Sequence, residues 1–103
     1  MLIPASGGGN VKYYTNTVLS TSTAINSAGS AVATVPSDAT EVLALIPLAI
    51  NPNEHWPDAQ HGETLTGIWA TSVVVNTRTI SFTARGTSMP TQTFAVNYLV
   101  IYK

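Results

Sequence analysis

Hydrophobic and polar residues alternate with a period of two along much of this chain. Ile80, Phe82 and Ala84, for example, alternate with residues that carry a hydroxyl group or a charge. Such alternation is typical of an antiparallel strand with one face on a core and the other in water. No segment sustains apolar residues at the i, i+3, i+4 and i+7 spacing of an amphipathic helix. The pattern therefore predicts an all-β chain.

The predicted strands are short, and turn residues separate them. Thr and Val are abundant, and both are β-branched residues that fit a pleated sheet better than a helix. Clusters of Gly, Pro, Asn and Ser divide the chain into strands near residues 11–20, 30–35, 41–50, 64–70, 72–75, 79–85 and 93–102. About seven short strands predict an antiparallel β-sandwich, such as a jelly roll.

Three local features are expected within this framework. A tight hairpin is predicted around Asn76 and Thr77, because Asn accepts the left-handed backbone that such turns need. Gly67 is expected to mark a bulge. Trp69 is expected in the core, because Ile68 and Ala70 flank it within a strand.

Two of the predicted strands are apolar on both faces. In the last strand, Leu99 and Ile101 lie opposite a face that is itself apolar, and residues 42–50 are almost entirely apolar. An antiparallel sandwich normally leaves one face of each sheet in water. Homo-oligomeric assembly would bury the second face, and we expect Leu99 and Ile101 at that contact. The alternative is that sheet curvature or the N-terminal tail covers this face within a monomer.

The composition bounds the possible functions. At 103 residues the chain is one domain, and the absence of cysteine excludes disulfides and thiolate chemistry. Only 9% of the residues are charged, against about 25% in an average soluble domain. The four cationic residues, Lys12, Arg78, Arg85 and Lys103, are scattered, so the basic footprint of a nucleic-acid-binding protein is missing. A surface this neutral again favours coverage by partners.

The N-terminus divides into a short tail and a flexible joint. Residues 1–9 are predicted to form an arm, because three consecutive glycines are costly to order, and residues 10–103 form the domain. Leu2 and Ile3 are the apolar residues with which this arm is expected to contact an assembly partner. The start lacks the features of a signal peptide, and no apolar run approaches the roughly 20 residues of a membrane-spanning helix.

Most of the reactive side chains lie in one segment, "NEHWPDAQHGE", at residues 53–63. Trp56, Asp58 and His61 there are candidate ligand-binding residues, because a sugar stacks on an indole while polar groups bind its hydroxyls. The spacing of His55 and His61 matches no zinc template, so no metal ligand is assigned. The plain alternative is a polar surface loop with Trp56 folded back onto the sandwich. No nucleophile motif or facing carboxylate pair is apparent, so we predict neither an enzyme nor a cofactor.

The C-terminal part, residues 64–103, resembles small β-sandwich domains at the tips of bacteriophage tail fibres, which are similar to the H-type lectin fold. The resemblance lies in the strand "TISFT", at residues 79–83, and in the last strand "NYLVI", at residues 97–101. Tyr98 stands where that family often has Trp, and the chain ends in Tyr102 and Lys103 rather than in Gly. No glycan-contacting residue matches position by position, so none is transferred. The resemblance implies a trimeric sandwich and a virus particle as its setting.

These observations together predict a non-enzymatic structural protein exposed on a phage-type virion. The chain begins with Met and contains no fibrous shaft, which favours a small capsid decoration or head-fibre protein over a complete tail fibre. The expected partners are further copies of the chain, other virion proteins and a host-surface glycan, with no nucleic acid and no membrane. The alternative is a carbohydrate- or receptor-binding module that uses residues 53–63.

Overall fold

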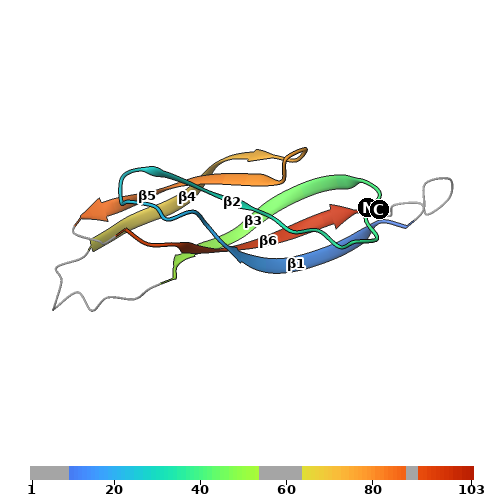
Figure 1. The fold of residues 1–103 in the computed structure, drawn as a ribbon, viewed down its shortest axis with the longest axis horizontal. Coiled ribbons are helices and arrows are strands. Elements are labelled where there is room, and N and C mark those ends of the chain that lie inside the picture. Colours follow the sequence, from blue (N-terminus) through green and yellow to red (C-terminus); the bar gives the residue numbers. More distant parts are fainter. Residues whose placement is uncertain (1–9, 54–63, 88–90) are drawn as a thin grey trace.

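The computed structural model describes residues 10–53, 64–87 and 91–103, and within these the chain is all-β without a helix. The six strands are β1 (Lys12–Leu19), β2 (Ala28–Val32), β3 (Val42–Pro52), β4 (Thr64–Val74), β5 (Thr79–Thr87) and β6 (Phe94–Tyr102). They form two three-stranded antiparallel sheets that pack face to face (Figure 1). The predicted all-β antiparallel sandwich is confirmed.

Both sheets have the same plan, with a late strand in the centre. Their orders are β1-β6-β3 and β2-β5-β4, and every pairing is antiparallel. β3 lies beside β4 along one side of the sandwich, and β1 lies beside β2 along the other. Each of these four strands therefore has one edge that is not part of a sheet ladder.

The strand count differs from the sequence-based expectation at residues 64–75. Two strands are predicted there, but the structure has one, β4, which runs from Thr64 to Val74. The apolar alternation breaks near Thr71 because the register with β5 shifts between Ala70 and Ser72. A bulge of this kind admits an extra residue without ending the strand, so a break in the pattern does not mark a turn.

The core is built from the inward faces of the two central strands. On β6, every second residue from Phe94 to Tyr102 is buried, and on β5 the same holds for Ile80, Phe82 and Ala84. The rings of Phe82 and Phe94 meet edge to face across the sandwich, with their centroids 5.2 Å apart. The alternation in the sequence therefore identifies the core positions of both central strands.

The sandwich is long and narrow. It measures 57 × 23 × 20 Å, and its radius of gyration is 16.4 Å, against about 13 Å for a compact domain of 100 residues. An elongated body of this size has a large surface for its volume, so its core holds only one face of each sheet. The outer faces of both sheets consequently form most of the surface.

The turn between β4 and β5 also differs from the prediction. The backbone N–H of Arg78 donates to the carbonyl of Val75, and Arg78 has the left-handed backbone, with φ of 58°. The left-handed residue therefore ends the turn, and Asn76 within it is not left-handed. The hairpin itself is where the sequence predicts it, but its loop is longer than the two-residue turn expected from Asn76 and Thr77.

Candidate functional site

The outer face of the β1-β6-β3 sheet is the first candidate surface. Residues that lie directly opposite each other in a sheet point to the same face. The outer face therefore consists of the outward residues of β6 and their register partners on β1 and β3. This apolar face consists of Tyr13, Thr15, Thr17, Leu19, Ala44, Ile46, Ala49, Asn51, Ala95, Asn97, Leu99 and Ile101. None of these side chains is charged.

Leu99 and Ile101, the residues predicted to form an assembly contact, lie at the centre of the apolar face. Leu99 lies between Thr15 of β1 and Ile46 of β3, and Ile101 lies between Tyr13 and Ala44. Both are half-buried by these neighbours rather than enclosed in the core. The structure thus places them on a surface that a second molecule can reach.

Two bulges in β3 add further apolar side chains beside this face. The register with β6 shifts between Val42 and Ala44 and again between Pro47 and Ala49. The two residues inserted at these shifts are Leu43, which is 41% exposed, and Leu48, which is 56% exposed. Leu48 borders a shallow depression of about 450 Å³, whose other walls include Thr15, Thr17 and Asn97. The bulges explain why residues 42–50 have no polar face in the sequence.

The outer face of the β2-β5-β4 sheet has a different character. Its central strand contributes only polar side chains, namely Thr79, Ser81, Thr83, Arg85 and Thr87. We call this surface the hydroxyl face. Hydroxyl groups are well hydrated, so the central strand of this face is suited to water, whereas Val32, Trp69 and Val74 on its two flanks are exposed apolar side chains.

Trp69 lies on the hydroxyl face and not in the core, so the prediction of a core Trp69 is wrong. Its partner in the register is Thr83, whereas Ile68 and Ala70 pair with the inward residues of β5. Neighbouring residues of a strand point to opposite faces, so apolar neighbours indicate an outward Trp69. The indole is 48% exposed, and its six-membered ring lies over Gly67. Gly67 follows a register shift, which confirms the predicted bulge.

A small apolar groove runs beside Trp69, between the edges of β3 and β4. It has a volume of about 170 Å³ and is lined by Pro47, Leu48, Ala49, Ile50, Ile68, Trp69 and Ala70. The groove connects the exposed side chains of Leu48 and Trp69. No sequence pattern predicts it, because its two walls belong to different sheets.

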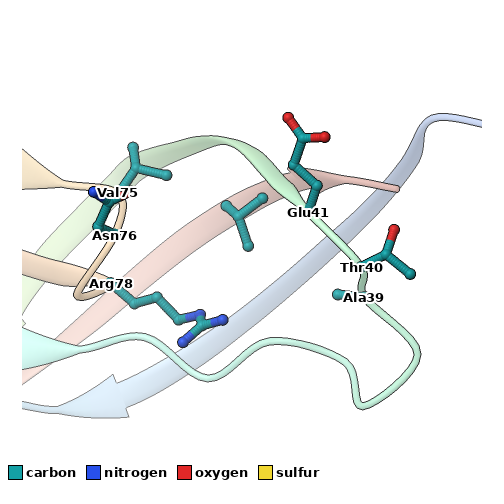
Figure 2. Close-up of a pocket in the computed structure, with 7 residues that line it drawn as sticks. Ala39, Thr40, Glu41, Val75, Asn76 and Arg78 are labelled. Atoms are coloured by element: carbon teal, nitrogen blue, oxygen red, sulfur yellow. The ribbon is translucent and has the colours of Figure 1, made fainter. Parts of the chain in front are cut away.

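A second cavity, of about 210 Å³, lies at the end of the sandwich near the β4–β5 turn (Figure 2). It is lined by Ala39, Thr40, Glu41, Val42, Val75, Asn76 and Arg78. The carboxylate of Glu41 points away from the guanidinium of Arg78 (Figure 2). It forms an ion pair of 3.8 Å with Lys103 instead. The two opposite charges therefore do not converge on one ligand position.

Lys12 and Asp38 form an ion pair at the surface. Lys12 donates a hydrogen bond of 2.9 Å to Asp38, which lowers the pKa of that carboxyl and raises the pKa of Lys12. Both side chains are about half exposed, so solvent screens the pair.

Within the described ranges, no three His, Cys, Asp or Glu side chains gather as metal ligands do. The same ranges contain no helix able to cross a membrane.

The predicted ligand-binding residues Trp56, Asp58 and His61 lie outside the described residues, as do Leu2, Ile3 and the rest of the predicted arm. The structure fixes only the position where the 53–63 segment begins. Asn53 donates from its backbone N–H to the carbonyl of Thr93 at 3.0 Å and from its amide to the Thr93 hydroxyl at 3.2 Å. The assignments of these five residues stay predictions.

The chain matches no protein family, no curated protein and no solved structure.

Proposed function

We propose that the chain is a non-enzymatic structural protein of a bacteriophage-type virion, exposed on the particle as a capsid decoration, head-fibre or tail-fibre-like protein. It acts through homo-oligomeric assembly, and a trimer is expected. The observation that carries the proposal is the apolar face, in which Leu99, Ile101 and Ile46 lie among nine further uncharged side chains. Contiguous exposed surfaces of this kind mark sites of association.

The size of the apolar face favours contacts with more than one neighbour. Three strands about 4.8 Å apart and about nine residues long span an area of about 14 by 30 Å. This is about 400 Å² of flat surface, whereas a stable interface buries about 800 Å² on each partner. A ring in which each copy contacts two others, as in a trimer, buries more surface per copy than a dimer through this face alone.

The virion setting is supported by the resemblance of residues 64–103 to tail-fibre tip domains. The two motifs of that resemblance fall on β5 and β6, the central strands of the two sheets. A protein on a particle surface also needs one side for attachment and one side for water. The contrast between the apolar face and the hydroxyl face meets that need.

The direct experiment is to look for the chain in purified particles of the phage whose genome encodes it. We expect quantitative mass spectrometry to find it in a fixed ratio to the major capsid or tail protein. Labelled antibody should bind the surface of intact particles and should not bind particles from a deletion strain. If infected cells contain the chain but the particles purified from them lack it, the chain is not a virion protein.

A carbohydrate- or receptor-binding module is the second candidate, and Trp69 favours it. An exposed indole whose six-membered ring lies beside Gly67, with Thr83 as its partner in the register, offers a stacking surface and a hydroxyl group to a sugar. This surface differs from the 53–63 segment that the sequence suggests. A saccharide that raises the melting temperature of the unmodified protein, but not of Trp69→Ala, would favour this candidate over a purely structural role.

A further inference from the structure

The four strand edges of the sandwich are protected to different degrees. An unprotected edge presents free N–H and C=O groups that pair with other chains, so proteins cover, shorten, bend or interrupt such edges. β3 is interrupted by Pro47 and Pro52 and contains two bulges. β4 also contains two bulges. β2 has only five residues, and the backbone of Ser30 within it is hydrogen-bonded to Thr21.

Within the part of the chain that the structure describes, β1 lacks the prolines, the bulges and the short length that protect the other three edges. It pairs with β6 over eight residues in one unbroken register and contains no proline. Its one charged residue, Lys12, is at its first position. It is thus the longest regular edge of the molecule, and no hydrogen bond within the described ranges occupies its outward backbone groups.

The register identifies which groups of β1 point outward. The backbone N–H of Ser20, which directly follows β1, donates to the carbonyl of Phe94 at 2.8 Å. Hydrogen-bonded positions alternate along an antiparallel ladder, so the even-numbered residues of β1 bond to β6. The N–H and C=O groups of Tyr13, Thr15, Thr17 and Leu19 therefore point away from the sheet.

We infer that β1 pairs antiparallel with β1 of a second copy of this chain, about a two-fold axis at Asn16. In this register Tyr13 lies opposite Leu19 of the partner subunit, and Thr15 lies opposite Thr17 of the partner subunit. All four outward residues then exchange both of their hydrogen bonds, about eight in total, whereas a shift of two residues in either direction leaves about six. The two sheets join into one six-stranded sheet.

The side chains fit the same register independently of the hydrogen bonds. Tyr13 and Leu19 are two of the most exposed large apolar residues, at 66% and 56%, and they stand at opposite ends of β1. The pairing places each against the other across the axis, and aromatic–aliphatic and Thr–Thr pairs both stabilise antiparallel strands.

The position of Lys12, whose charge Asp38 partly offsets, also favours the antiparallel orientation. A parallel arrangement would place the two Lys12 side chains side by side. In the antiparallel pair they are about 27 Å apart along the strands, beyond the screening length of about 8 Å at physiological salt.

This edge contact goes beyond the proposed function and does not depend on a virion setting. Because it is a two-fold contact, it doubles the number of copies in the assembly that the apolar face forms. It also makes the apolar faces of two copies continuous, because the outward side chains of both β1 strands lie on that face.

Two doubly substituted proteins test the register by analytical ultracentrifugation. Tyr13→Lys with Leu19→Lys places like charges in both outer pairs, whereas Tyr13→Lys with Leu19→Glu places opposite charges there. Both lose the same apolar contacts. We expect the dissociation constant of the two-fold contact to be at least about tenfold higher for the Lys/Lys protein than for the Lys/Glu protein. Equal constants for the two proteins would exclude this register.

Thr15→Pro tests the edge itself. Its N–H points away from β6, so proline at this position leaves the ladder to β6 intact but blocks a partner strand. We expect the mass of the largest species to halve, with an unchanged circular dichroism spectrum. Thr15→Val, which keeps the N–H, and Val32→Lys, which charges an exposed residue of β2, should both keep the mass of the unmodified protein. A folded Thr15→Pro protein of unchanged mass would overturn the proposal, and so would an equal loss of mass in Val32→Lys.

Discussion

Gly29 shows how tightly single positions are constrained in this narrow core. A Cβ atom added there would lie 2.5 Å from the Thr23 hydroxyl oxygen and 2.6 Å from the ring of Phe82. Phe82 is fully buried and packed against Phe94, so its ring has no space into which to move. Gly29 is thus the position at which the backbone of β2 approaches the aromatic centre of the core.

We therefore expect Gly29→Ala to lower the free energy of unfolding by about 1–3 kcal/mol, the usual cost of overfilling a packed core. Gly67→Ala is the matched control, because its new Cβ would meet only the ring of the half-exposed Trp69, 3.0 Å away. That ring is free to shift toward solvent, so a change within about 0.5 kcal/mol is expected. Urea denaturation measures both. If the free energy of unfolding falls equally in the two variants, the Phe82 ring moves aside and the expected clash at residue 29 is absent.

At the scale of elements, the sequence predicts the strands that alternate and fails where bulges intervene. The bulges of the β3–β6 and β4–β5 ladders insert their extra residues into β3 and β4, so β5 and β6 alternate without interruption and their core residues follow directly from the sequence. β4 is predicted as two strands because its register shift at residues 70–72 interrupts that alternation. Trp69 is predicted in the core because Ile68 and Ala70 are apolar, but adjacent residues of a strand face opposite ways, so buried neighbours place Trp69 outside. The groove beside it joins two sheets, and sheet packing is not encoded in local periodicity.

The buried Tyr98 side chain links the first sheet to Thr34, which also accepts a hydrogen bond of 3.0 Å from the Asn16 amide of β1. The Tyr98 hydroxyl, at the centre of β6, accepts from the backbone N–H of Thr34 at 2.8 Å and donates to its carbonyl at 2.7 Å. Thr34 lies just after β2, so the Tyr98 side chain connects the first sheet to the chain leaving the second. The ring itself is fully buried.

Tyr98→Phe keeps the ring and removes both bonds, together with the contact of 2.8 Å between the Tyr98 and Thr34 hydroxyl groups. We expect the free energy of unfolding to fall by about 1–3 kcal/mol, because backbone groups of Thr34 lose their partner. Tyr13→Phe, which removes a hydroxyl from a side chain that is 66% exposed, should change it by no more than about 0.5 kcal/mol. Thermal denaturation of both variants compares them. A Tyr98→Phe protein as stable as the Tyr13→Phe protein would show that water replaces the link.

At the scale of the whole molecule, the narrow sandwich encloses one face of each sheet and leaves two contrasting outer faces. The apolar face includes Leu99, Ile101 and Ile46 without a charge, whereas β5 supplies the hydroxyl face with polar side chains alone. The charged and polar side chains of the protein are therefore distributed unevenly between the two outer faces. Homo-oligomeric assembly, as proposed, requires that further copies of the chain cover the apolar face.

The mass of the protein in solution, measured by light scattering at micromolar concentration for three proteins, tests this requirement. The unmodified protein should have a multiple of the 10.8 kDa chain mass. Leu99→Asp places a charge at the centre of the apolar face and should lower that mass while the protein stays folded, because Leu99 is outside the core. Ser81→Asp, at the corresponding outward position of β5, should leave the mass unchanged. A folded 10.8 kDa monomer of the unmodified protein, or a Leu99→Asp protein with the same mass as Ser81→Asp, would contradict the account.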